Sequence, residues 1–428
     1  MINLYKNLFI INILFLLSFS PFNSKDIYEI VDIISLDNET YFREAIDKIN
    51  KNGGIIHINT SVINIKENIP MEIKGNIPGG IVGIKQSNGE YPRINFEYVR
   101  NSGSFLSLTI FGEGQFLKSL IIENSGANGL VISGKNNIID HVITRYNQYA
   151  GIFISNTANN NTFNYCYSYR NCDIKGHGIN GNGFFSNGGS NNNFNYCFSW
   201  DNSNNGFGIS SHEIISSTLS FTHSPTWNNG NANIFSGKYD YSKGNSLDKN
   251  MLTVQHLINS DDENFINNYK KKEFSLENCT IDDEPAMSWV SITNGRTRGN
   301  GFQFGFAYNI NVASIQRYAD LCISFEHKGK GFDNNYSKKY IGYFTNCVSF
   351  NNYVNYQLPY NFKKWSNNWG WGAIKDDQID MEEELNKPVN INSAIKNFYL
   401  IRNSIIKSVY ANNFPDNINF DNVILNLN

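Results

Sequence analysis

The chain has 428 residues, 40% of them hydrophobic, so it is long enough to bury a sizeable core. A formal net charge of −3 and a pI near 6.2 argue against nucleic acid as the main partner, because such partners select a basic face. Asparagine is frequent, in runs such as residues 191–193, but it alternates with aromatic and aliphatic residues. This pattern indicates turns in an ordered β fold rather than a disordered chain.

Residues 1–24 have the pattern of a secretory signal peptide. Lys6 gives a basic start, and residues 8–17 are almost wholly apolar but too few to span a membrane comfortably. Several serines near the end of this stretch offer cleavage positions. We expect a secreted, extracellular protein that leaves the membrane after cleavage; an uncleaved anchor is the alternative.

A secreted chain can form disulfides and carry glycans. Six cysteines allow disulfides, but four share one slot of a repeat, which favours small buried residues: Cys166, Cys197, Cys322 and Cys347. No CxxC pair occurs, so we expect no zinc site. Five Asn-x-Ser/Thr sequences predict a glycoprotein where the host glycosylates: Asn38, Asn59, Asn160, Asn278 and Asn335.

The first predicted element is an amphipathic helix over about residues 41–52, in the stretch YFREAIDKINKNGG. The glycine pair at its end stops the helix, and the following IIHINTSVINI predicts strands. A helix at this place would cap the first coil of a solenoid and cover its open sheet edge.

A repeat follows. Three stretches share the order aromatic, two residues, Cys, one residue, Ser, aromatic, one residue, Asn: NTFNYCYSYRN from 161, NNFNYCFSWDN from 192 and GYFTNCVSFNN from 342. Gly129 and Gly151 are 22 residues apart, and Gly183 and Gly206 are 23 apart. Such a period predicts one solenoid coil per repeat, with parallel strands about 4.8 Å apart. Because the LxxLxL pattern is absent, we predict an all-β, right-handed parallel β-helix over residues 25–380, with Cys, Phe and Ser pointing inward.

Two segments depart from this rhythm. Residues near 228–296, which include SDDENFINNYKKKEF, predict an insertion that forms a wall or lid beside the strand face. From about residue 376 an acidic run is followed by apolar stretches such as residues 397–409, which predict further strands. We assign residues 381–428 to final coils and a C-terminal cap, and we expect a monomer.

Between residues 120 and 356 the sequence resembles polysaccharide lyase family nine, the pectate lyase-like β-helix proteins. The motifs that carry the resemblance are GINGNGFF (178–185), SWDNSNNGFGI (199–209), RGNGFQFG (298–305) and GKGFDNN (329–335). One GxGF is weak evidence, whereas four in order on a solenoid are fairly specific. The resemblance implies a pectin lyase-like solenoid that acts by β-elimination on a pectic or other uronate-containing polysaccharide.

Members of that family hold calcium with aspartates and use a lysine as the base. The cation neutralises the carboxylate beside the proton that is removed, and it favours the neutral lysine. The aspartate of the first motif corresponds to Asn182, and the paired aspartates of the second to Asn204 and Asn205. The next aspartate corresponds to Gly208 and the lysine to Gln303. All five are replaced, so we expect no tight calcium site and no other cofactor, and the family mechanism cannot run as written.

Three functions stay open. An altered lyase would use the amides at these positions, with His177 or Tyr169 as the base and Arg298 or Lys175 to hold a carboxylate. A degenerate carbohydrate-binding scaffold would keep the surface without catalysis, with the tryptophans of residues 363–372 stacking on sugars. The third is a β-helix glycoside hydrolase, because GHG at 176–178 is similar to the polygalacturonase motif; the acid pair that hydrolysis needs is missing.

Asp333 is the one acidic residue that we place on the strand face that carries Asn204 and Gln303. It follows Gly-Phe, as Gly208 and Gln303 do, so register between coils would place the three in one outward column. The candidate catalytic residues are therefore His177, Gln303 and Arg298. The candidate substrate-binding residues are Asn182, Asn204, Asn205, Lys175 and Asp333.

Overall fold

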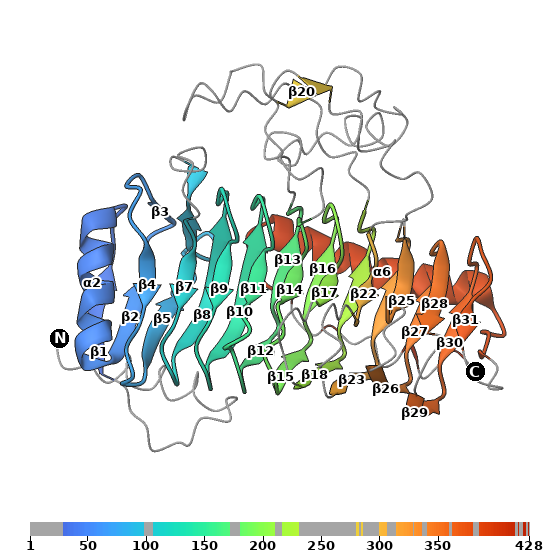
Figure 1. Cartoon of the computed structure of the whole chain (residues 1–428). Helices are drawn as coiled ribbons and strands as arrows, with labels where there is room; N and C mark the ends of the chain where they lie inside the picture. The colour runs from blue at the N-terminus through green and yellow to red at the C-terminus, as the bar shows by residue number, and fades with distance from the viewer. Residues whose placement is uncertain are drawn as a thin grey trace.

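The computed structural model describes most of the chain (Figure 1). The described residues are 29–97, 106–171, 180–209, 216–230, 280–281, 284–285, 299–305, 314–327, 329–335, 340–358, 362–379, 385–415, 418, 423–424 and 427. The predicted signal peptide and most of the predicted insertion lie outside them. Among the described helices, none is long and apolar enough to cross a membrane.

Short parallel strands stack coil upon coil into a β-helix, which confirms the predicted fold (Figure 1). One side of the solenoid is sheet B, in which each strand pairs with its equivalent in the next coil. Its strands are β4 (Met71–Ile73), β7 (Leu108–Ile110), β9 (Leu130–Ile132), β11 (Ile152–Ile154), β14 (Phe184–Ser186), β17 (Phe207–Ile209), β22 (Phe302–Gln303), β25 (Lys330–Asp333), β28 (Val354–Leu358) and β31 (Gln378–Ile379).

Sheet A forms the rest of the coil as two strips. The long strands β8 (Phe116–Glu123) and β10 (Ile138–Arg145) belong to both strips, each half pairing with a different neighbour. The first strip also contains β1 (Ile30–Ile34), β2 (Gly54–Ile58), β5 (Gly79–Gly83), β12 (Thr162–Asn164), β15 (Asn192–Asn195), β18 (Ser216–Thr222), β23 (Ser314–Asp320), β26 (Tyr340–Thr345) and β29 (Phe362–Ser366). The second strip also contains β3 (Val62–Asn64), β6 (Arg93–Asn95), β13 (Tyr167–Tyr169), β16 (Phe198–Trp200), β19 (Pro225–Trp227), β24 (Ile323–Phe325), β27 (Val348–Phe350) and β30 (Trp369–Trp371).

Within the predicted insertion, two short strands are described. β20 (Thr280–Ile281) and β21 (Glu284–Pro285) pair antiparallel, whereas the coil strands pair in parallel. This part of the chain therefore leaves the coil pattern. Its predicted position beside sheet B stays a prediction.

The repeated cysteine and phenylalanine point inward, as predicted. Cys166, Cys197, Cys322 and Cys347 are fully buried in the core and are free thiols. Phenylalanines of sheet B stack directly above one another, with ring centroids 4.7 Å apart for Phe184 and Phe207 and 4.8 Å apart for Phe207 and Phe302. Side chains in equivalent positions thus form continuous columns through the solenoid.

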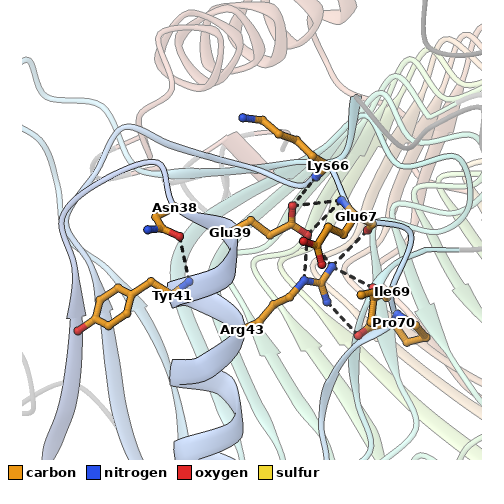
Figure 2. A network of polar contacts seen from close by, with 8 residues as sticks. All are labelled: Asn38, Glu39, Tyr41, Arg43, Lys66, Glu67, Ile69 and Pro70. Carbon is orange, nitrogen blue, oxygen red and sulfur yellow. Dashed lines mark hydrogen bonds and ion pairs between the residues drawn. The ribbon is translucent and has the colours of Figure 1, made fainter.

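The predicted capping helix is α2 (Glu39–Asn52), which covers the first coil with a buried apolar stripe. The Asn38 side chain accepts the N–H of Tyr41 at 3.0 Å and so caps its start. Figure 2 shows how its first turn holds the loop after β3: Glu39 accepts the backbone N–H of Lys66 at 2.6 Å and binds Arg43. Arg43 in turn donates to the carbonyl of Ile69 at 3.0 Å.

The prediction of strands in residues 397–409 is wrong, because this stretch lies in the helix α6 (Ile391–Tyr410). The helix lies along the outside of the second strip (Figure 1). Phe398 contacts Phe350 with ring centroids 5.2 Å apart, and Tyr410 contacts Tyr169 at 5.5 Å. Beneath it the outward side chains form a nearly continuous aromatic stack: Tyr169, Trp200, Trp227, Phe325, Phe350 and Trp371. The C-terminal segment therefore covers a side of the solenoid.

This packing predicts how two residues of α6 contribute to stability. Phe398 is fully buried, whereas Leu400 is 59% exposed on the other side of the helix. Phe398→Ala should lower the free energy of unfolding by about 3–5 kcal/mol, through lost burial and a cavity. Leu400→Ala, the matched control, should change it by less than about 0.5 kcal/mol. Urea unfolding of both variants tests this; equal losses would contradict the observed orientation of α6.

The corner after the second strip is held by a ladder of buried amides. Nδ2 of Asn147 donates to Oδ1 of Asn171 at 2.9 Å, and Nδ2 of Asn171 donates to Oδ1 of Asn202 at 2.9 Å. His327 occupies one position of this ladder. Its Nδ1 accepts the backbone N–H of Asn229 at 3.1 Å, so the buried ring is neutral, and burial lowers the pKa of His327 to about 3.

A pH dependence of stability follows from His327. The folded pKa of about 3 lies below the ordinary value of 6.5, so the unfolded chain takes up the proton first. Stability should therefore fall as the pH drops below about 6.5, with a loss of about 3 kcal/mol between about pH 7 and pH 4. His327→Asn keeps the ladder and should remove this loss. Urea unfolding at both pH values measures the difference; an identical pH dependence in the two proteins would refute this role of His327.

Candidate functional site

The outer face of sheet B carries the candidate site. Parallel register places Gly208 beside Gln303 and Gln303 beside Asp333, which confirms the predicted register of the three residues, although Asp333 is buried. We call the whole line the outer column. Its members are Glu72, Thr109, Val131, Phe153, Phe185, Gly208, Gln303, Asp333, Gln357 and Gln378.

A second line of residues stands just before the inward-facing Gly-Phe pair of these strands. We call Asn182, Asn205 and Asn300 the asparagine line, and Lys330 is the equivalent residue of the next coil. Each asparagine Oδ1 accepts the backbone N–H of the next residue in this order, at 3.1, 3.0 and 2.8 Å. The amide oxygens therefore join neighbouring coils. Asn300 and Lys330 were not among the predicted site residues, although their shared place before Gly-Phe was a usable signal.

Two amide nitrogens of the asparagine line reach the outer column, whereas Nδ2 of Asn182 donates to the carbonyl of Asn180 at 3.2 Å. Nδ2 of Asn205 donates to Oε1 of Gln303 at 2.5 Å, and Nδ2 of Asn300 donates to Oδ2 of Asp333 at 3.2 Å. Nζ of Lys330 forms an ion pair with the same carboxylate oxygen at 3.0 Å. Burial raises the pKa of Asp333, which is 1% exposed, and the charge of Lys330 offsets part of that shift.

Gly208 contributes no side chain to the outer column. A Cβ placed there would lie 2.8 Å from Oδ1 of Asn182 and 3.2 Å from Nδ2 of Asn205. The backbone N–H of the neighbouring, half-buried Asn204 donates to the carbonyl of Gly181 at 2.9 Å. The positions matched to calcium ligands thus lie close together, although none of them carries a carboxylate.

These residues do not fit a tight calcium site. Calcium takes six to eight oxygen ligands, of which several are usually carboxylates. Here Oδ1 of Asn182 and Oδ1 of Asn205 accept backbone N–H groups, and Oε1 of Gln303 accepts an amide N–H. In the part of the chain that the structure describes, no three His, Cys, Asp or Glu side chains gather as a metal-binding group.

Other predicted site residues lie elsewhere. His177, Lys175 and Arg298 are outside the described residues, so their roles stay predictions. Tyr169 as an alternative base is wrong: it is fully buried on the second strip, where its hydroxyl accepts a hydrogen bond from Arg145 at 3.0 Å. That strip is a different side of the coil from sheet B.

The predicted use of tryptophans for stacking on sugars is also wrong. Trp369 and Trp371 are buried between the second strip and α6, in a cluster that includes Phe398. Trp365 is 7% exposed and belongs to the interior core. All three therefore close the last coils of the solenoid.

Stacked coils of parallel strands make this protein a parallel β-helix. A family model described as "Pel9A-like, right handed beta helix region" matches residues 35–248, which are 214 of the 428 residues. The chain belongs to this Pel9A-like, right-handed β-helix family.

Two solved structures share the fold at low identity. The crystal structure of pectate lyase Pel9A is 16% identical, with a TM-score of 0.57, over 92% of this chain and 90% of that chain. A rhamnogalacturonan lyase is 14% identical, with a TM-score of 0.54, over 88% of this chain and 90% of that chain. No curated protein matches the sequence.

The lost carboxylates predict weak or absent calcium binding. We expect calorimetry to show no site tighter than about 1 mM, because the amide oxygens are uncharged and already bonded. The matched positive control changes Asn182, Asn204, Asn205 and Gly208 to Asp and Gln303 to Lys. This variant should gain calcium binding, since an aspartate at 182 or 205 can still accept the backbone N–H. Micromolar binding by the natural chain, abolished in Asn205→Ala, would contradict the prediction.

Proposed function

We propose that the protein binds an extended polysaccharide across the outer face of sheet B and does not carry out calcium-dependent β-elimination. Family membership and two fold relatives named as a pectate lyase and a rhamnogalacturonan lyase support this class of ligand. A pectic or other uronate-containing chain is the proposed ligand. We further propose that the protein acts outside the cell as a monomer.

One contact carries the proposal: the 2.5 Å hydrogen bond from Nδ2 of Asn205 to Oε1 of Gln303. Elimination needs a base that accepts a proton near neutral pH, and a glutamine amide is not one. It also needs charge to stabilise the carbanion, and the amide at 205 supplies a hydrogen-bond donor without charge. The amide nitrogen of Gln303, a half-buried residue on this face, suits hydrogen bonding to sugar hydroxyls.

A metal-independent lyase is the second candidate. It is favoured by the donors of Asn205 and Asn300, which point to the outer column, because such donors can stabilise negative charge on a substrate carboxylate. His177 would be its base, and Arg298 or Lys175 would bind the carboxylate. A β-helix hydrolase lacks such support.

Two assays separate these functions. Affinity electrophoresis should show retardation by polygalacturonate or another pectic chain, and the ultraviolet absorbance of unsaturated products should not rise, with or without calcium. Calcium-independent product that His177→Ala abolishes would establish the altered lyase instead. Unretarded migration through all polysaccharides, with no product, would overturn the proposed function.

A further inference from the structure

Lys330 departs from the rule that the asparagine line follows. Asn182, Asn205 and Asn300 each use the side-chain oxygen to accept a backbone N–H of the next coil. A lysine has three N–H donors and no acceptor, so Lys330 cannot join coils in this way. Among the described residues of the outer column, the asparagine line and its continuation at 330, Lys330 is also the one cation. The joining of coils therefore does not account for a lysine at this place.

The ammonium group of Lys330 is held at the outer face of sheet B. Its Nζ forms an ion pair with Oδ2 of Asp333 at 3.0 Å. That carboxylate also accepts two neutral donors, Nδ2 of Asn300 at 3.2 Å and the backbone N–H of Asn335 at 2.8 Å. The Lys330 side chain is 15% exposed and that of Asp333 is 2% exposed, so the lysine is the partner that solvent reaches. A ligand on this face therefore meets the ammonium group rather than the carboxylate.

An ammonium group in this setting suits a carboxylate of a ligand. It has three N–H donors, so it can bind Asp333 and a second carboxylate together. The two neutral donors stabilise the charge of Asp333, which limits the repulsion between the two carboxylates. In a uronate the carboxylate projects from the sugar ring, so the ring stays outside the sheet. Gln303 is in register with Asp333 on the next strand, about 4.8 Å away, where its amide can bond to a hydroxyl of the same chain.

We propose that Lys330 binds the carboxylate of one uronate unit of the bound polysaccharide, and that Asp333 positions the ammonium group. This inference rests on the proposed function and deepens it, because it assigns recognition of the uronate to one residue. The positive charge that a uronate requires on this face then comes from the chain itself, since no tight calcium site is expected there.

Affinity electrophoresis and calorimetry with polygalacturonate and with its fully methyl-esterified form test the assignment without altering the protein. Esterification removes the charge and keeps the sugar chain, so it should weaken binding at least about tenfold. Lys330→Gln should weaken binding of polygalacturonate by a similar factor and leave binding of the esterified chain unchanged. Lys118→Gln is the matched control, because Lys118 is paired with Asp140 at 2.8 Å on the first strip. It removes the same charge from another side of the solenoid and should leave both affinities unchanged.

A second variant guards against loss of folding. Lys330→Gln leaves the buried Asp333 without its cation, which lowers stability. Lys330→Gln combined with Asp333→Asn removes both charges and should lose polygalacturonate binding to the same extent. Urea unfolding curves identify which variants are folded under the conditions of the binding assay.

The outcomes separate the two proposals. Equal affinity of the natural chain for the charged and the esterified polysaccharide overturns the assignment and leaves polysaccharide binding standing. A preference for the charged form that persists in folded Lys330→Gln protein also overturns it, because the carboxylate is then bound elsewhere, as by Arg298 or Lys175. If the natural chain binds no polysaccharide, the proposed function fails and the assignment of Lys330 fails with it.

Discussion

The solenoid depends on corners that only left-handed backbone can make. Within one coil Asn160, Tyr165 and Arg170 all have φ between 50° and 58°, a conformation that costs a non-glycine residue roughly 1–2 kcal/mol. What offsets this cost lies in the neighbouring coils: Asn161 bonds to Asn192 at 3.0 Å, and Asn171 bonds to Asn202 at 2.9 Å. A coil is therefore stable only when it is packed between neighbouring coils. The asparagine-rich composition follows from the need to form these corners and to bond them together.

The same requirement explains how the candidate site can lose its acids and keep its shape. The oxygen at Asn182 or Asn205 must accept a backbone N–H from the next coil, and a carboxylate oxygen can do the same. Exchange between aspartate and asparagine therefore alters the charge of the face while the coils stay joined. For this reason the fold shared with pectate lyase Pel9A, at 16% identity, does not determine the chemistry of the outer face of sheet B. A function can be argued only from the residues on that face.

Most of the fold could be predicted from the sequence, because every coil must bury the same kinds of side chain and turn at the same corners. The inward cysteines, the capping helix and the column of Gly208, Gln303 and Asp333 all followed from periodicity. The helix α6 did not, since residues 397–409 carry apolar residues at spacings that suit either a strand or a helix. The missed signal was the large apolar residues on both sides of each repeated serine: with serine inward, they face outward and need a cover. The pairing of Asp333 with Lys330, three residues apart on one strand, is a side-chain contact that periodicity does not show.

The solenoid has several columns of stacked side chains, and they differ in whether the stacking is interrupted. The difference follows from which part of the protein covers each column. Inside sheet B the rings stack without a gap from Phe184 to Tyr356, and under α6 they run from Tyr169 to Trp371. Each stacked pair contributes about 0.5–1.5 kcal/mol beyond burial, so stability favours an unbroken column wherever other protein lies against it. The outer column instead breaks after two rings, at Gly208. Packing explains that break: a Cβ at 208 would lie 2.8 Å from Oδ1 of Asn182 and 3.2 Å from Nδ2 of Asn205, so these two amides fill the place that a side chain at 208 would take.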